Sequence, residues 1–284
     1  MRGALVERMG WHVRKARVSL APTPACPSRP DRIPARARRA TSAGAPPGMA
    51  SDPYCEHHGP RGDAAGAPRL SRKGGVMYAR TTIIMADPAR MDDGIADVRD
   101  NVMPGLSGMD GHVGVSLLCD RDSGRCIVTT AWETEEAMAA TRDRVRQMRQ
   151  RATEQFGGSD SEVQEWEIAV MHRAHTMAEG GWARVIFSRL REGTEADRVI
   201  DAWKAEILPR MDEFDGFSSV SLMVDRAAGR GVSTVCFDDR ESMERSREMG
   251  DRMRNEFSGA MGVDITDVAE MEIAIHHLRV PEMA

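Results

Sequence analysis

The sequence predicts an α+β fold in which two tandem modules of one kind follow a disordered N-terminal tail. Three observations predict it. The first 76 residues are basic and rich in proline, the remainder repeats itself at a constant offset, and each copy shows the same order of strand and helix patterns. With 284 residues, of which 41% are hydrophobic, the chain is long enough for two small domains with real cores.

Residues 1–76 form the predicted tail. The first 75 residues hold 14 Arg or Lys against 5 Asp or Glu, although the whole chain has a formal net charge of -5. Most of the prolines lie in the same stretch. Such a composition buries too little apolar surface to offset the entropy that is lost on ordering, so we predict that the tail is disordered.

This tail has three interpretations. Its arginines could bind nucleic acid or anionic lipid, and this is the one feature through which nucleic acid would become a partner. It could be a targeting peptide, although it lacks the usual apolar stretch and cleavage site. It could also be absent from the natural protein, because Lys73-Gly74-Gly75 can be encoded by a purine-rich ribosome-binding sequence just before Met77.

The remainder of the chain contains an internal repeat. The stretch GVSLLCDRDSGRCIVTT, from Gly114 to Thr130, recurs as SVSLMVDRAAGRGVSTV from Ser219 to Val235, an offset of 105 residues. A period of this length is that of a domain rather than of a solenoid repeat. We therefore predict two homologous modules, 77–175 and 181–279.

Each module reads as strand, helix, strand, strand, helix, strand, which is the ferredoxin-like βαββαβ pattern. β-Branched and aromatic residues mark the strands, Asp-Arg-x-x-Gly-Arg joins the middle two as a hairpin, and apolar residues at helical spacing mark the helices. The predicted strands are 78–85, 112–119, 126–132 and 165–172 in the first module and 182–189, 217–224, 231–237 and 270–277 in the second.

The first helix of each module carries start and stop signals. Asp87 followed by Pro88 predicts an N-cap in the first module, and Thr194 predicts one in the second. Pro104 and Pro209 predict where the two helices end, because the residue before a proline disfavours helix.

Neither face of the predicted sheets is strongly polar. In the last strand of the first module, Ile168 and Val170 alternate with Ala169 and Met171. A lone module would leave one apolar face in water, at a cost of roughly 25 cal/mol per Å². We predict that the two modules pack sheet to sheet, so that the chain is a monomer with an internal pseudo-dimer; further oligomerisation is left open.

These stretches resemble a known superfamily. The segments PGLSGMDGHVGVSLL (104–118) and TTAWETEEAM (129–138), with PRMDEFDGFSSVSLM (209–223) and VCFDDRESM (235–243) in the second copy, are similar to the antibiotic-biosynthesis-monooxygenase-like branch of the dimeric α/β-barrel superfamily. The resemblance implies an intramolecular dimeric α/β barrel with a ligand site between the sheet and the helices of a module. It also implies a cofactor-independent monooxygenase-like enzyme that acts on a small aromatic or quinol-type molecule. The alternative is a non-catalytic barrel that binds a small ligand or is associated with stress.

The haem-degrading relatives resemble one another in an Asn on the first strand and a Trp and a His in the second helix. The first strand here has Thr81 and Thr82 instead, and the helix predicted over 135–156 has neither Trp nor His. Haem degradation is therefore not expected. Trp132 matches a different tryptophan of the superfamily, just before that helix, and with Thr82 it is a predicted substrate-binding residue.

His172 and His277 are the predicted catalytic residues. They occupy equivalent positions near the ends of the two closing strands, in phase with Ile168 and Val170 in the first module and with Ile273 and Ile275 in the second. A neutral imidazole there could act as general base on an acidic phenol. The alternative is a strand-end histidine that meets solvent.

Arg80 and Arg184 lie in the middle of the first strand of each module and are predicted to bind the substrate's developing phenolate. The alternative is a salt bridge to Glu167 or Glu272 on the closing strand.

Other arginines are expected to be solvated. They are those of the two hairpins and those of the predicted second helix, namely Arg142, Arg144, Arg146, Arg149 and Arg151.

No cofactor or metal is predicted, because neither module has a Gly-rich strand-to-helix turn and no residue cluster has metal-ligand spacing. The five cysteines form no C-x-x-C pair, so we expect free thiols and a cytoplasmic location. No apolar run approaches the roughly 18 residues of a membrane helix. The predicted partner is a small apolar or aromatic ligand, with no membrane.

Overall fold

The computed structural model describes residues 75–177 and 179–283, so the predicted disordered tail lies almost entirely outside the described residues. Module 1 comprises β1 (Met77–Met85), η1 (Pro88–Arg90), α1 (Met91–Asp97), η2 (Val98–Val102), α2 (Met103–Ser107), β2 (His112–Cys119), β3 (Arg125–Trp132), α3 (Glu135–Ala140), α4 (Arg142–Gln155) and β4 (Ser161–Arg173). Module 2 comprises β5 (Trp182–Leu190), α5 (Ala196–Ala202), η3 (Trp203–Ile207), η4 (Leu208–Glu213), β6 (Phe217–Asp225), β7 (Arg230–Phe237), α6 (Arg240–Arg245), α7 (Arg247–Met261) and β8 (Val263–Leu278).

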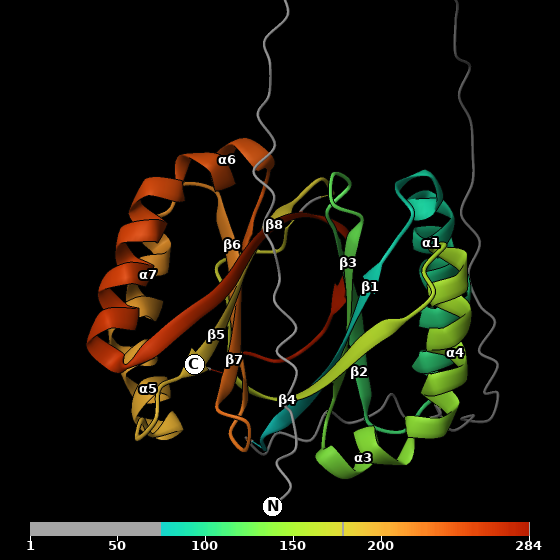
Figure 1. The fold of residues 1–284 in the computed structure, drawn as a ribbon, viewed down its shortest axis with the longest axis horizontal. Helices are drawn as coiled ribbons and strands as arrows, with labels where there is room; N and C mark the ends of the chain where they lie inside the picture. The colour runs from blue at the N-terminus through green and yellow to red at the C-terminus, as the bar shows by residue number, and fades with distance from the viewer. Residues whose placement is uncertain (1–74, 178, 284) are drawn as a thin grey trace, which may run out of the picture. The chain divides into compact units, whose positions relative to one another are not determined.

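The eight strands close into one antiparallel barrel in the order β1-β3-β2-β8-β5-β7-β6-β4. Within each module the order is that of a ferredoxin-like sheet, β4-β1-β3-β2 and β8-β5-β7-β6. The helices of the two modules cover opposite outer sides of the barrel (Figure 1). The predicted fold class, a tandem pair of ferredoxin-like modules forming an intramolecular dimeric α/β barrel, is confirmed.

The two long closing strands join the modules. β4 pairs with β1 of its own module and then with β6 of the other, while β8 pairs with β5 and then with β2. Every sheet edge therefore finds a partner, which removes the unpaired strands that a lone module would expose. The sequence analysis predicted packed faces but not these two backbone seams.

A register shift interrupts each seam, between Ile168 and Val170 in β4 and between Ile275 and Ile273 opposite Leu117 and Leu118. The extra residue of a bulge reverses which side the following residues face. Ile168 and Ile273 thus belong to the apolar core inside the barrel, whereas Ile275 packs with the sheet–helix core of module 1. The strict alternation predicted for the closing strands is wrong beyond these points.

Three apolar cores result. One fills the barrel, with Trp166 and Met271 among its buried residues, and one lies under the helices of each module. Trp132 and Phe237 occupy equivalent positions in the two sheet–helix cores and are both almost fully buried.

The predicted helix signals are partly confirmed. Asp87 accepts a hydrogen bond from the Ala89 amide, with Pro88 in the first turn, as predicted. Thr194 does not cap α5; its hydroxyl donates instead to the Gly262 carbonyl at the end of α7 (3.3 Å).

The helical chain continues past Pro104 and Pro209, so the predicted ends are wrong. Each proline follows one wide π turn, η2 or η3. Because a π turn has a different hydrogen-bond spacing, the chain can continue past a residue that has no N–H.

Two hairpin arginines form ion pairs between the modules. Arg121, in the β2–β3 turn, contacts Glu272 on β8 at 2.8 Å, and Arg226, in the β6–β7 turn, contacts Glu167 on β4 at 2.7 Å. The expectation that these arginines are merely solvated is therefore wrong.

No helix in the described residues is long and apolar enough to cross a membrane.

Candidate functional site

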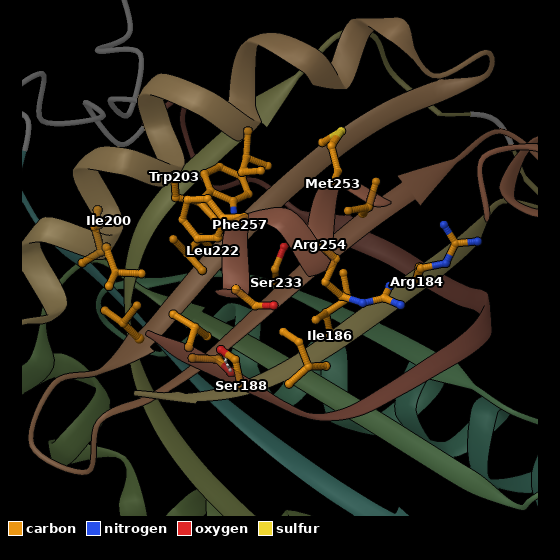
Figure 2. A pocket seen from close by; sticks show the side chains of 18 of the residues that line it. Arg184, Ile186, Ser188, Ile200, Trp203, Leu222, Ser233, Met253, Arg254 and Phe257 are labelled. Carbon is orange, nitrogen blue, oxygen red and sulfur yellow. Dashed lines mark hydrogen bonds between the residues drawn. The ribbon is translucent and has the colours of Figure 1, made fainter. Parts of the chain in front are cut away.

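The two modules enclose unequal cavities between sheet and helices. The cavity of module 2 has a volume of about 120 Å³, whereas that of module 1 has about 30 Å³. Figure 2 shows side chains that line the larger one. The larger space identifies module 2 as the candidate ligand site, because small-molecule sites are concave and mostly apolar.

Side-chain size differs in both directions between the two cavities. Trp203 and Phe257 are larger than their module 1 equivalents, Val98 and Ala152, but other exchanges open the space in module 2. At four equivalent positions of the repeat, a side chain that narrows or closes the space in module 1 is replaced by a smaller one in module 2. These pairs are Ile84 and Ser188, Cys126 and Gly231, Val128 and Ser233, and Val145 and Gly250.

Phe156 fills module 1 further. Its side chain is fully buried and lies so close to Gly94 that an added Cβ there would stand 2.2 Å from the ring. Module 2 has Met261 and Val199 at the equivalent positions. The ring that closes module 1 therefore has no counterpart of the same size in module 2.

Large apolar side chains form most of the wall in module 2. Trp203 comes from the π turn η3, Phe257 and Met253 from α7, and Leu222 from β6 (Figure 2). π turns are frequent at functional sites, and here the turn carries the largest aromatic side chain of the wall. Such a surface favours a flat, apolar ligand.

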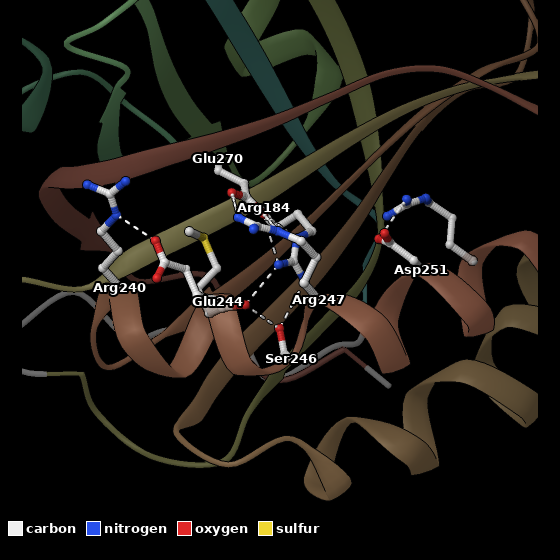
Figure 3. A network of polar contacts seen from close by, with 9 residues as sticks. Arg184, Arg240, Glu244, Ser246, Arg247, Asp251 and Glu270 are labelled. Carbon is white, nitrogen blue, oxygen red and sulfur yellow. Dashed lines mark hydrogen bonds and ion pairs between the residues drawn. The ribbon is translucent and has the colours of Figure 1, made fainter. Parts of the chain in front are cut away.

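Arg184 lies at one end of this cavity, but its guanidinium is fully engaged. Its Nε and Nη2 donate to Glu270, its Nη1 donates to the Ser246 hydroxyl at 2.9 Å, and its Nη2 also donates to the Met243 carbonyl at 2.8 Å (Figure 3). Ser246 is the residue at which the second helix breaks between α6 and α7. Arg184 therefore ties the strand to the helix break.

A similar network occurs in module 1, except that Nη1 of Arg80 is buried without a hydrogen-bond partner. Arg80 bonds Glu165 and the Met138 carbonyl, at the break between α3 and α4. The alternative of a salt bridge to the closing strand thus describes both arginines, but the acids are Glu165 and Glu270. The predicted acids, Glu167 and Glu272, instead bind the hairpin arginines of the opposite module.

These bonds shift the acidity of the two glutamates. In module 1, hydrogen bonds from Arg142 and Arg80 hold the pKa of Glu165 below its ordinary value. In module 2, burial works to raise the pKa of Glu270, but hydrogen bonds from Arg247 and Arg184 outweigh it and hold this pKa below the ordinary value as well. Both carboxylates are therefore charged partners of a buried arginine at neutral pH.

Arg254 on α7 also lines the module 2 cavity, and the sequence analysis missed it. Its side chain is only 17% exposed; Nη2 contacts Asp251 at 2.8 Å, while Nη1 is buried without a hydrogen-bond partner. The equivalent residue, Arg149, lines the small cavity of module 1, and burial lowers its pKa. Arg149 was expected to be solvated. It follows Val145 by four residues, as Arg254 follows Gly250, so each arginine lies on the same side of its helix as a residue that faces the sheet. This spacing is the signal that could have located both arginines.

His172 and His277 do not line either sheet–helix cavity. His172 Nδ1 lies 2.6 Å from Glu282 Oε1, and its ring stacks on Phe217. His277 is exposed and lies 3.3 Å from Arg279. His172 stays in phase with Val170, and His277 with Ile275, but the bulges break the predicted phase with Ile168 and Ile273. The catalytic role of the two histidines stays a prediction.

The remaining predicted site residues belong to module 1. Thr82 and Arg80 line its small cavity. Trp132 is completely buried and donates through Nε1 to the Thr130 hydroxyl at 3.1 Å. The structure therefore brings Arg80 and Thr82 together but places Arg184 in the other cavity.

Among the described residues, Cys119, Cys126 and Cys236 are free thiols. The sulfurs of Cys119 and Cys126 lie 3.5 Å apart across the β2–β3 hairpin. The described part of the chain brings together no group of three or more His, Cys, Asp or Glu side chains that could hold a metal ion.

Comparison with known proteins places this geometry in a family. Residues 77–148 match the family model of the antibiotic biosynthesis monooxygenase domain. Over 223 residues the chain is 48% identical to uncharacterized protein Rv2557 of Mycobacterium tuberculosis, covering 78% of this chain and 99% of the relative. A second protein of that organism, Rv2558, is 46% identical over 226 residues, covering 79% and 95%.

Solved structures show the same fold at low identity. An anthrone oxidase-like protein superposes with a TM-score of 0.52 at 13% identity, covering 75% of this chain and 96% of that one. A candidate monooxygenase from Lactobacillus acidophilus gives a TM-score of 0.53 at 9% identity, covering 73% and 97%. The chain belongs to the same family as the two M. tuberculosis proteins; its first module matches the antibiotic biosynthesis monooxygenase domain, and its two tandem modules have the dimeric α/β-barrel fold.

Proposed function

We propose that the module 2 cavity is the active site of a cofactor-independent monooxygenase-like enzyme that acts on a small aromatic or quinol-type molecule. One observation carries the proposal: the apolar cavity of module 2 has a volume of about 120 Å³ against about 30 Å³ in module 1, and its wall includes a few polar side chains, among them Ser188, Ser233 and Arg254. An apolar space with a small number of polar groups is typical of a substrate site.

The size of the cavity limits the substrate. An engineered apolar cavity of about 150 Å³ holds one benzene molecule. The cavity of module 2, at about 120 Å³, is somewhat smaller, so it favours at most a single ring, and side chains of its wall must move to admit substituents.

Oxygenation of an electron-rich ring needs no external reductant. A substrate that loses a proton becomes an anion that can pass an electron to O2; a carbon–oxygen bond then forms, and one oxygen atom leaves as water while the other stays on the product. Both electron pairs come from the substrate, so a hydroquinone and one O2 give a hydroxyquinone and one water. The protein's tasks are to bind the ring, stabilise its anion and exclude bulk water.

The printed names of the structural relatives, an anthrone oxidase-like protein and a candidate monooxygenase, agree with this class of reaction. They lend support by analogy only, since one fold hosts many activities.

Oxygen consumption tests the proposal. The full chain is incubated with a panel of single-ring hydroquinones and activated phenols in an oxygen electrode, against heat-inactivated protein. We expect uptake above autoxidation with at least one member, and we expect it to persist in His172→Ala and His277→Ala, because neither histidine lines the cavity. If no member of the panel raises uptake, the oxygenase proposal is wrong.

A second function has one observation in its favour. No histidine is among the described residues that line the module 2 cavity, and the carboxylate of Asp225 accepts hydrogen bonds from Arg230 and the Ala228 amide, so no unengaged general base is present there. A barrel that binds a small aromatic ligand without converting it would show saturable binding of panel members and no oxygen uptake.

A further inference from the structure

We infer that the module 2 cavity binds its aromatic ligand as a phenolate-type monoanion, and that Arg254 is the residue that selects this charge state. The inference rests on the proposed function only for the place of the ligand. It adds the charge of the bound ligand and names the residue that lowers the ligand's pKa.

Three arginines line the cavity, and they differ in which nitrogens lack a hydrogen-bond partner. Arg230 donates through Nη2 to Asp225, although its Nε is also buried without a partner. Arg184 spends all three of its nitrogens on Glu270, Ser246 and the Met243 carbonyl. Arg254 has one partner, Asp251, which is 45% exposed and contacts Nη2 alone. Arg254 lies at the wall of the cavity (Figure 2), and its buried Nη1 is a donor that a ligand oxygen could satisfy.

A buried donor on a charged group destabilises the site until it finds an acceptor, and a charged acceptor satisfies it best. The carboxylate among the lining residues, that of Asp225, does not supply this acceptor. Asp225 lies at the β6–β7 turn, where it accepts hydrogen bonds from Arg230 and from the Ala228 amide. An oxygen anion that enters with the ligand is the partner that is left.

Ser233 provides a second donor on the opposite wall. It lies on β7, facing α7 across the cavity, and its hydroxyl makes no hydrogen bond within the described residues. Ser188, in contrast, donates to the Gly231 carbonyl at 3.2 Å. A guanidinium from the helix and a hydroxyl from the strand are suited to one phenolate oxygen.

This arrangement replaces a general base. A cation beside a bound phenol favours its ionised form and so lowers its pKa, and the proton can then pass to bulk water. No histidine lines the cavity among the described residues, so the site would activate its ligand by lowering the ligand's own pKa. Arg254 would act as a specificity-determining and anion-stabilising residue.

p-Nitrophenol tests the inference, because its phenolate absorbs visible light and its phenol does not. The apparent pKa of the bound chromophore is measured by titrating full-length protein and p-nitrophenol, with binding followed in parallel for nitrobenzene, a neutral ring of similar size. We expect the bound pKa to fall by about one unit, which is about tenfold tighter binding of the phenolate than of the phenol. Nitrobenzene should bind with no dependence on pH.

Variants locate the effect. Arg254→Gln should abolish the shift and leave nitrobenzene binding unchanged, Arg254→Lys should keep part of the shift, and Ser233→Ala should reduce it. The matched control is Arg149→Gln, at the same position of the repeat beside the 30 Å³ cavity, which should leave the shift intact. Thermal melting of each variant checks that it is folded; if Arg254→Gln does not fold, Arg254→Lys with Ser233→Ala decides.

Several results would overturn the inference: no binding of p-nitrophenol, a bound pKa that is unchanged or raised, a shift that survives in Arg254→Gln, or a shift that disappears in Arg149→Gln. Oxygen uptake separates this inference from the proposed function. A lowered pKa without uptake supports anion binding and refutes the oxygenase, whereas uptake with an unshifted pKa does the reverse.

Discussion

Modules 1 and 2 share their framework and differ in what fills it. Both hold a buried arginine from the first strand against a glutamate on the closing strand and the carbonyl at the break of the second helix. Both interrupt the closing strand with a bulge and send one hairpin arginine to the other module. The features that are common to the copies therefore belong to the architecture.

The cavity is the feature that is not shared. In module 1, Phe156 and Ile84 complete the packing, whereas module 2 has Met261 and Ser188 at these positions and an opening of about 120 Å³. Each missing buried methylene group forgoes about 0.8 kcal/mol. Module 2 thus loses packing contacts that module 1 makes. A ligand bound in the cavity of module 2 would restore contacts of this kind.

The largest effect is expected from opening module 1. Ile84→Ser copies Ser188 into a position that is 1% exposed, and we expect it to lower the free energy of unfolding by about 3 kcal/mol, because it removes buried apolar contacts and leaves a cavity. Urea denaturation followed by circular dichroism measures the change.

Ser188→Ile is the matched control for that variant, since it copies the module 1 residue into the open cavity. We expect it to change the free energy of unfolding by less than about 1 kcal/mol, because the added carbons enter existing space and only the bond to the Gly231 carbonyl is lost. Equal and large losses in the two variants would mean that packing does not distinguish the modules.

A smaller effect is expected from filling the open cavity. Ser188→Ile combined with Ser233→Val should weaken nitrobenzene binding by at least about tenfold, or about 1.4 kcal/mol, because the side chains occupy the ligand's space. Isothermal titration calorimetry measures the affinity. Thr82 and Thr130 in module 1 serve as the reference: exchanging both for Val should leave the affinity unchanged, and an equal loss there would place the ligand elsewhere.

The architecture was predictable because the sequence contains two copies of the same module. The offset of 105 residues fixed the order of elements in both modules, and the hairpin sequence located the middle strands to within a residue at each end. The seams were not predictable, because β4 and β8 carry apolar residues on consecutive positions such as Ile168, Ala169 and Val170. The residues are apolar on both sides of the bulge, so the sequence pattern does not indicate that the side chains beyond it face the other side of the sheet.

The candidate site was less predictable than the fold. Selecting His172 and His277 required knowing which side of the closing strand they face, and the bulge decides that. Arg254 was hidden among the other arginines of its helix, because net charge does not say which side of a helix is buried. The cavity itself depends on a comparison of side-chain sizes between copies, for instance Val145 with Gly250, which only the packed structure makes meaningful.

The smallest effect is expected from pH, and it concerns what the modules share. The pKa values of Glu165 and Glu270 lie below their ordinary value of 4.5 in the folded protein. The stability that these carboxylates contribute is therefore fully present above pH 4.5 and is lost as the pH falls through their folded pKa values, because the unfolded chain binds protons first. Glu165→Gln and Glu270→Gln should each remove a similar part of the fall in unfolding free energy between pH 6 and about pH 3. Glu248→Gln, at an exposed site on α7, should remove none. Denaturation series at several pH values measure the slope; a pH dependence confined to one glutamate would show that the arginine networks of the two modules are not equivalent, in spite of their matching bonds.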